Sequence, residues 1–437
     1  MTPTPIYTPM TGPRILTYEN RLLVLLTFSF GLVFFDRNAV NFLMPFIVAD
    51  LGFSNTQVGM FAAGLSLTWA VSGFIIGMRA DRAGKRKTYL VMAVLAFSLC
   101  SIFTGLAVSF LTLLLARMIM GAAEGPFMPL SQSLMVPAST PRRRGLNMGI
   151  VQTLGGSLLG GFAAPLIVIA LAEAFHWRSA FFVAAVPGLL IAIYMIKAVQ
   201  EPVSRTEAVP PSTTTHPAPV AGRTTGLAQV IKIRNVWLCV LICCFLFSWG
   251  IVGMTFLPLY FVNARGMSPG DMSILMAVLG VSSGLFGAFI GPGLSDRLGR
   301  KPVVIGFSLV GGIAPLALLN FNGSFVLLNI LCFLGWSASG AFVLVMATIP
   351  AESIPPRYIA SVVGLTQGVG EIAGGMLAPL LAGRMADRFN LAAPLVLMAA
   401  CAITASVLAC LLKETAPGKP SASGEIGEMG SVTYEKH

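Results

Sequence analysis

Twelve long apolar stretches constrain this chain more than any other feature. Each is long enough to cross about 30 Å of hydrocarbon as an α-helix. Of the 437 residues, 56% are apolar and only 10% are charged, whereas a soluble domain carries roughly 25% charged residues. The sequence therefore predicts an all-α membrane protein with twelve transmembrane helices. The approximate spans are 21–47, 55–77, 88–107, 110–135, 145–172, 178–199, 235–263, 270–292, 302–321, 324–350, 359–385 and 391–412.

The distribution of basic residues predicts which side of the membrane each loop faces. If both tails are cytoplasmic, most of the 28 lysines and arginines fall in cytoplasmic segments. Such an excess is the positive-inside bias. It accounts for the net charge of +11 without nucleic acid binding. We expect a multi-pass protein of a bacterial-type inner (cell) membrane with both termini in the cytoplasm.

Two motifs recur along the chain, which indicates an internal duplication. Gly160-Gly161 and Pro165 recur 214 positions later as Gly374-Gly375 and Pro379. The run 77–87 has a related run at 293–301. We therefore expect two pseudo-symmetric halves of six helices each, which rock against each other around a site near the middle of the membrane. The expected division is an N-terminal tail 1–20, halves 21–199 and 235–412, a cytoplasmic linker 200–234 and a tail 413–437.

The repeated Asp-Arg-x-Gly-basic runs lie in short cytoplasmic loops and are predicted to form a cytoplasmic gate. An Asp in such a loop can reach a helix N-terminus or an arginine, and a Gly permits a tight turn. A plain positive-inside signal would need neither residue. The candidate gate residues are Gly77, Asp81, Arg82, Gly84, Asp296 and Arg297.

The two halves and the Gly77–Lys87 run resemble the major facilitator superfamily. The resemblance covers essentially residues 20–412. It implies twelve helices and transport by alternating access. It also implies that the halves work together in a functional monomer.

Five ionisable residues fall well inside the predicted spans: Asp36, Arg37, Arg117, Glu124 and Glu371. A charge at bilayer depth costs about 2.5–3.5 kcal/mol and normally has a function. Arg117 and Glu124 are two helical turns apart and share one face of their helix, and Gly121 between them permits close approach of a neighbour. Four of the five belong to the first half, so we expect the proton chemistry there.

Asp36-Arg37 after an aromatic residue, together with Arg117-x-x-x-Gly121-x-x-Glu124, resembles the anion:cation symporter family. That family includes bacterial proton symporters for galactonate, hexuronates and other organic acids. The resemblance implies that Asp36 and Glu124 exchange protons. It also implies that Arg37 couples protonation to substrate binding and that Arg117 pairs with the carboxylates. Phe34 stands where the family commonly has tyrosine, so the pocket loses a hydroxyl.

The remaining polar and aromatic residues of the spans are candidates for substrate contact. Glu371 has three possible roles besides a structural one: a partner for substrate hydroxyls, an extra proton site, or a contact for a cationic group. Amides inside a membrane need partners, which favours Gln152 and Gln367. Aromatic candidates are Phe34, Trp69 and Trp336, with Trp249 and Tyr260 less favoured because membrane aromatics more often serve packing.

The leading hypothesis is a proton symporter that imports a small organic anion, a carboxylate such as an aromatic or sugar acid. When the anion binds Arg37 bidentately, Asp36 loses a neutralising charge and takes a proton more readily. The first alternative is a proton-coupled exporter of drugs or metabolites. The second is a non-transporting sensor on the same scaffold.

Other classes of function lack support in the sequence. The seven cysteines all fall in predicted spans, without metal-ligand spacing or a disulfide framework. No arrangement of an enzyme nucleophile or phosphate loop is evident. We therefore expect no enzyme activity, no metal, no cofactor and no nucleic acid partner. The expected partners are protons, the anion and the lipid bilayer.

Overall fold

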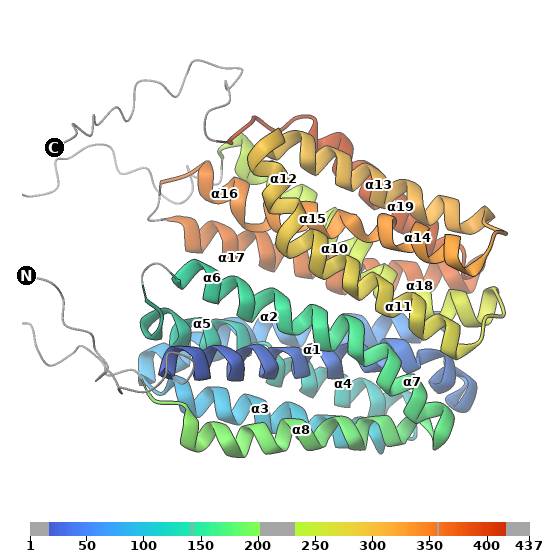
Figure 1. Cartoon of the computed structure of the whole chain (residues 1–437). Helices are drawn as coiled ribbons and strands as arrows, with labels where there is room; N and C mark the ends of the chain where they lie inside the picture. The colour runs from blue at the N-terminus through green and yellow to red at the C-terminus, as the bar shows by residue number, and fades with distance from the viewer. Residues whose placement is uncertain (1–16, 141–142, 202–231, 356–357, 417–437) are drawn as a thin grey trace, which may run out of the picture.

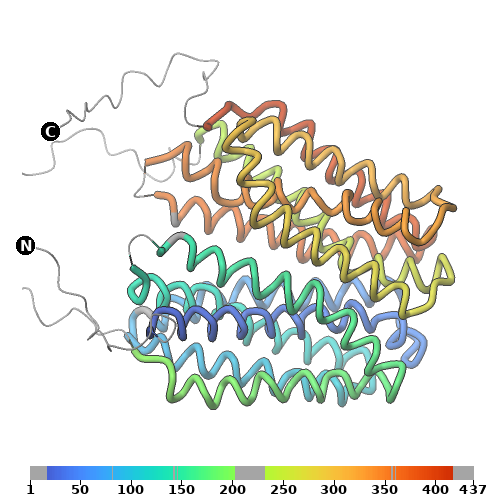
Figure 2. Tube along the Cα trace, in the orientation of Figure 1, coloured from blue at the N-terminus to red at the C-terminus, as the bar shows by residue number. Residues whose placement is uncertain are grey.

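The computed structural model describes residues 17–140, 143–201, 232–355 and 358–416. In this part of the chain two bundles of helices pack side by side, and the start of α1 and the end of α19 lie at the same end of the assembly (Figure 1). We call that end, with residues 84, 201, 299 and 416, the tail side. The opposite end, with residues 52, 107, 176, 266, 322 and 390, is the distal side. The trace in Figure 2 shows the helices running between the two sides.

The first bundle contains the N-terminal half of the predicted spans. Its helices are α1 (Tyr18–Leu51), α2 (Asn55–Ala83), α3 (Arg86–Gly105), α4 (Phe110–Glu124), α5 (Phe127–Ala138), α6 (Arg144–Gly149), η2 (Ile150–Leu154), η3 (Gly156–Ala163), α7 (Ala164–Ala174) and α8 (Trp177–Ala198).

The second bundle repeats the arrangement. Its helices are α10 (Arg234–Leu259), η5 (Tyr260–Ala264), α11 (Pro269–Gly284), η6 (Leu285–Ile290), α12 (Gly291–Leu298), α13 (Arg300–Asn320), α14 (Phe325–Gly335), η7 (Trp336–Ala338), α15 (Ser339–Val343), η8 (Leu344–Thr348), α16 (Ile349–Glu352), α17 (Ile359–Gly370), η10 (Glu371–Leu377), α18 (Ala378–Arg388) and α19 (Ala393–Ala409). The η segments are π-helical, except η7, which is a 3₁₀ turn.

The prediction of twelve transmembrane helices in two halves is confirmed. In the described part of the chain, ten segments are long and apolar enough to cross a membrane. The α17–η10–α18 segment and α19 complete the twelve. The fourth span is divided at Gly125-Pro126, since proline cannot donate the backbone hydrogen bond that would continue the helix.

The repeated Gly-Gly motifs lie in π-helical segments at the contact between the halves. In η3, a Cβ on Gly161 would collide with Gly280 of α11. In η10, a Cβ on Gly375 would collide with Ser66 of α2. These glycines therefore let backbones of opposite halves approach closely. This explains why the same motif occurs once in each half.

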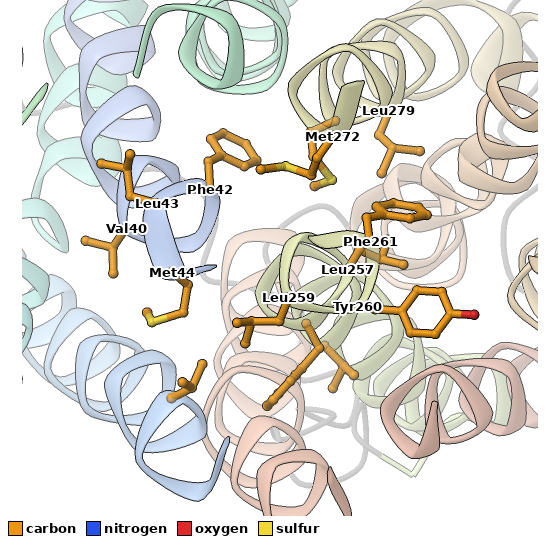
Figure 3. Packing of buried hydrophobic residues seen from close by; sticks show 14 of the residues in the cluster. Val40, Phe42, Leu43, Met44, Leu257, Leu259, Tyr260, Phe261, Met272 and Leu279 are labelled. Atoms are coloured by element: carbon orange, nitrogen blue, oxygen red, sulfur yellow. The ribbon is translucent and has the colours of Figure 1, made fainter. Parts of the chain in front are cut away.

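A hydrophobic cluster toward the distal side joins the two halves. Phe42 and Met44 of α1 belong to the same buried cluster as Leu259 of α10 and Met272 of α11. In Figure 3 the Phe42 side chain points toward Met272. Because these four side chains are at most 1% exposed, the structure is closed by apolar packing on the distal side.

Candidate functional site

Arg37 of α1 is the point at which the ionisable residues of the two halves meet. Its Nη2 lies 3.0 Å from Oε1 of Glu371, which begins η10 in the second half. The guanidinium carbon lies 5.9 Å from the ring centre of Phe34 and 5.7 Å from that of Trp69. The Arg37 side chain is 15% exposed and that of Glu371 only 4%. These four residues form what we call the Arg37 site.

Asp36, although adjacent to Arg37 in sequence, points into the first half. Its Oδ1 accepts a hydrogen bond of 2.6 Å from Ser101 of α3, whose oxygen also lies 3.1 Å from the carbonyl of Phe181. Its Oδ2 has no partner among the described residues, and the residue is 2% exposed. The structure thus separates the neighbouring acid and base onto different faces of α1.

Arg117 and Glu124 of α4 lie next to this carboxylate. Arg117 donates from Nη2 to the backbone carbonyl of Arg37 at 3.1 Å and from Nη1 to the sulfur of Met120 at 3.2 Å. Both oxygens of Glu124 lack a hydrogen-bond partner in the described structure. Arg117 is 2% and Glu124 1% exposed. An unpartnered buried carboxylate is costly unless it takes up a proton.

The four charged residues of the first half are brought together, but not as the sequence suggested. Asp36 and Arg37 do not pair with each other, and Arg117 makes its hydrogen bonds to a carbonyl and a sulfur. The repeats also predicted a site between the two halves. Only Arg37 reaches the partner half in this state, because the other three side chains are enclosed within the first half.

The other candidates for substrate contact fall into two groups. Gln152 in η2 and Gln367 in α17 are partly buried, and the described structure gives neither amide a hydrogen bond. Trp336 instead packs against Trp249, with the two rings tilted and 4.6 Å between their centres. The Trp249 indole donates to the carbonyl of Gly311 at 3.0 Å. The two tryptophans pack the second half.

Tyr260 is also placed by packing. It is 6% exposed and belongs to the hydrophobic cluster that closes the distal side. Figure 3 shows its ring pointing away from Phe42 and Met44 of the first half.

The predicted gate loops contain the expected glycine turns. Gly84 and Gly299 both have positive φ, of 62° and 110°. Asp296 bonds to Arg300, one turn further along its own half, and Arg300 also pairs with Glu352 at 2.8 Å. The loops therefore link helices within a half in this state.

Within the described residues, the other gate candidates make no contact that links the halves. Arg82 and Arg297 are exposed, and Gly77 packs near Pro129 of α5 within its own half. The side chain of Asp81 lies outside the described part of the structure.

Two glutamates on the tail side make contacts with helix starts that were not predicted from the sequence. Glu201 accepts from the backbone N–H of Lys87 at the start of α3, at 3.0 Å. Glu414 accepts from the N–H groups of Arg300 and Lys301 at the start of α13, at 2.8 and 3.2 Å. Burial opposes ionisation of Glu414, but four backbone N–H donors outweigh it and hold its pKa below the ordinary value. In the sequence, each of these residues follows shortly after a predicted span: Glu201 after the sixth and Glu414 after the twelfth.

Asp387 forms a distal contact between the halves that was also missed. The carboxylate, at the end of α18, accepts from the backbone N–H groups of Asn55 and Thr56, which begin α2, at 2.9 and 2.8 Å. The side chains of the same two residues donate to it at 2.9 and 2.6 Å. A carboxylate at a helix N-terminus is favourable in charge as well as in hydrogen bonding. Residue 387 falls between the predicted spans 359–385 and 391–412, where no local pattern indicates a contact with the other half.

Comparison with protein families decides which class this helical architecture belongs to. The family model described as Major Facilitator Superfamily matches residues 26–379 and 239–433. The chain belongs to the Major Facilitator Superfamily. It is therefore a multi-pass membrane transporter and not an enzyme. Among the described residues, no group of three or more His, Cys, Asp or Glu side chains could hold a metal ion.

The relatives include transporters of organic anions and exporters of drugs. The chain is 29% identical to the "Hexuronate transporter" of Bacillus subtilis, over 66% of this chain and 68% of that protein. It is 27% identical to the "Probable 4-methylmuconolactone transporter" of Cupriavidus pinatubonensis, over 78% of each. It is 25% identical to the "Quinolone resistance protein NorA" of Staphylococcus aureus, over 90% of this chain and 97% of that protein.

The fold also matches solved transporter structures. A bacterial homologue of the human lysosomal transporter Spinster, in an inward-facing and unoccupied conformation, superposes with a TM-score of 0.72. The match covers 91% of this chain and 96% of that chain at 21% sequence identity. At this identity the similarity concerns the fold.

Proposed function

We propose that this transporter is a proton-coupled symporter that imports a small organic anion by alternating access. The observation that carries the proposal is the arrangement around Arg37. A partly exposed guanidinium lies between the halves, flanked by Phe34 and Trp69, while two carboxylates without full hydrogen bonding lie behind it. This arrangement supports the proposal that anion binding and proton binding occur in adjacent layers of one site.

In the proposed cycle, the anion binds Arg37, and Asp36 and Glu124 take up and release protons. With all five residues ionised, the membrane-embedded groups carry one excess negative charge. Protonation of Asp36 and Glu124 reverses this to one excess positive charge, which favours an anion. Arg117 holds the Arg37 carbonyl and so links the buried carboxylates to the substrate-binding residue.

We further propose that the tail side faces the cytoplasm of a bacterial-type cell and the distal side faces outward. The packed residues around Phe42 and Met272 and the Asp387 contacts would then close the site to the outside. The candidate gate loops would close the cytoplasmic side at the other stage of the cycle. The predicted linker 200–234 would join the halves of a monomer.

Uptake into proteoliposomes tests the proposal. The vesicles contain the full chain and are given radiolabelled D-glucuronate, phenylacetate or mandelate outside. With an acidic exterior, at least one anion should accumulate above its equilibrium level, and a protonophore should abolish the accumulation. Accumulation that ignores the proton gradient would contradict coupling, and the absence of uptake for all three anions would contradict import of this class.

A proton-coupled exporter is the second candidate, because similarity to NorA extends over almost the full length of both proteins. The fifth span reads Gly160-Gly161-Phe-Ala-Ala-Pro165, which lacks the Gly-Pro-x-x-Gly-Gly run frequent in such exporters. The same vesicles distinguish the candidates, since an exporter would extrude a cationic dye in exchange for protons. A sensor would move neither compound.

A further inference from the structure

The Arg37 site already contains a carboxylate, supplied by the transporter itself. Glu371 is the one Asp or Glu that falls well inside the predicted spans of the second half. It reaches across to Arg37 of the first half, and its side chain is only 4% exposed. In the proposed cycle, Asp36 and Glu124 already exchange the protons, so this third carboxylate has no assigned role there.

The contact between these two residues is weaker than an arginine permits. The described structure gives the Arg37 guanidinium one hydrogen bond, from Nη2 to Oε1 of Glu371. A guanidinium presents five N–H donors in a planar fork that can bind one carboxylate through two parallel hydrogen bonds. A free carboxylate that approaches the 15% exposed guanidinium could therefore make a better contact than the resident one.

We propose that Glu371 is a resident competitor, which occupies the anion-binding site of Arg37 until the substrate carboxylate displaces it. This inference rests on the proposed anion-transport function. Binding then breaks the ion pair that joins α1 to η10, so occupancy of the site loosens a link between the halves. A ligand shifts a conformational equilibrium only through such a difference in contacts between states.

Displacement also selects the class of substrate. Glu371 lies in a buried position next to the incoming carboxylate, and a buried carboxylate without a donor is costly. A substrate that carries a hydroxyl group beside its carboxylate supplies that donor. Glu371 therefore favours hydroxy acids over unsubstituted acids of the same size.

The test measures the equilibrium binding of two ligands, phenylacetate and its α-hydroxy derivative mandelate, to the purified full-length protein. In Glu371→Gln the competitor is neutral, so phenylacetate affinity should rise roughly tenfold, which corresponds to the loss of one charge-assisted hydrogen bond. Mandelate affinity should rise less, and the wild-type preference for mandelate should shrink. Neutral phenylacetamide should gain nothing. The matched control is Glu173→Gln, at an exposed position of α7.

Each outcome has a definite meaning. If wild type binds the acids and Glu371→Gln binds them with affinity within twofold, or keeps the full preference for mandelate, the inference is overturned while anion transport stands. If neither protein binds either acid or glucuronate, both proposals are overturned. Should Glu371→Gln fail to fold, Glu371→Asp replaces it, because a side chain shorter by one methylene loses the 3.0 Å contact and should also raise affinity for phenylacetate.

Discussion

The two halves share one architecture but bury different groups at corresponding positions. The correspondence can be read from glycine contacts. A Cβ on Gly160 would collide with Phe34, and a Cβ on Gly374 would collide with Phe247. Phe34 of the first half thus corresponds to Phe247 of the second.

Two residues beyond these phenylalanines the halves diverge. The first half has Asp36, which accepts from Ser101 of α3. The second half has Trp249, which donates to Gly311 of α13, the third long helix of that half. One half thus buries an ionisable group where the other buries an apolar ring. The two halves therefore share one framework, and the two carboxylates proposed to exchange protons in the cycle, Asp36 and Glu124, both lie in the first.

Replacing Asp36 and Trp249 separately tests this difference between the halves most directly. Asp36→Asn should lower proton-driven uptake on the order of a hundredfold, the scale typical of losing a group that transfers a proton. Trp249→Phe keeps the apolar ring and should leave uptake within a few-fold of wild type, although it leaves the Gly311 carbonyl without its donor. Initial uptake rates in proteoliposomes with an acidic exterior measure both. Equal losses of uptake rate in the two variants would contradict the proposal that the first half carries the proton exchange.

A second prediction concerns the close backbone contact between the halves. Gly280→Val adds a side chain where α11 meets Gly161 of η3, so the distal side cannot close as seen here. We expect uptake to fall roughly tenfold, in line with the sensitivity of a small-residue helix contact. Gly306→Val, at an exposed position of α13, is the control, because a Cβ there meets nothing within 4 Å. Normal uptake by Gly280→Val would show that this closed state is not needed.

A third prediction concerns Asp387, which caps α2 from the opposite half. Asp387→Ala removes four hydrogen bonds that join the halves on the distal side. Each such exposed bond contributes only about 0.5–1.5 kcal/mol, so the equilibrium should shift toward a state that is open on the distal side, without loss of folding. Ala382→Cys introduces a thiol at a position that is buried in α18. A thiol-reactive label should modify this cysteine faster when Asp387→Ala is also present. An unchanged labelling rate would argue that apolar packing alone closes this side.

The smallest effect is expected at the paired glutamates of the tail side. Glu414→Gln should lower the free energy of unfolding by about 0.5 kcal/mol, the lower end of the range for a lost helix cap, and Glu201→Gln should have a similar effect. Because the pKa of Glu414 is held below its ordinary value of 4.5, its contribution is complete above that value. It is lost as the pH falls through the lowered pKa. Thermal unfolding of the wild type and of each variant at pH 7, and of Glu414→Gln also at acidic pH, measures these effects. If the difference in stability between wild type and Glu414→Gln grew on acidification, the helix-capping role of Glu414 would be contradicted.

The sequence predicted the fold well because the membrane imposes a strong and local requirement. Every span must satisfy its own backbone hydrogen bonds, so a run of apolar residues is read as a helix. The repeated Gly-Gly-x-x-x-Pro motif likewise predicted the duplication. The break at Gly125-Pro126 divided one predicted span without changing the count.

The site could be predicted only as a set of residues and not as a set of contacts. Asp36 and Arg37 are neighbours in the chain, yet successive residues of a helix point about 100° apart. Their partners, Ser101 and Glu371, come from a different helix and from the other half. Such pairing depends on how the bundles pack, which no local pattern records. The same reason hid the contacts of Asp387.

The π-helical turns around the paired glycines carry a mechanical consequence. In η3 and η10 each backbone hydrogen bond spans one more residue than in an α-helix, which leaves the turn wider. Both segments lie at the contact between the halves. In the proposed alternating-access cycle, each half would therefore rock on the other at a widened turn of its own backbone rather than at a regular α-helix.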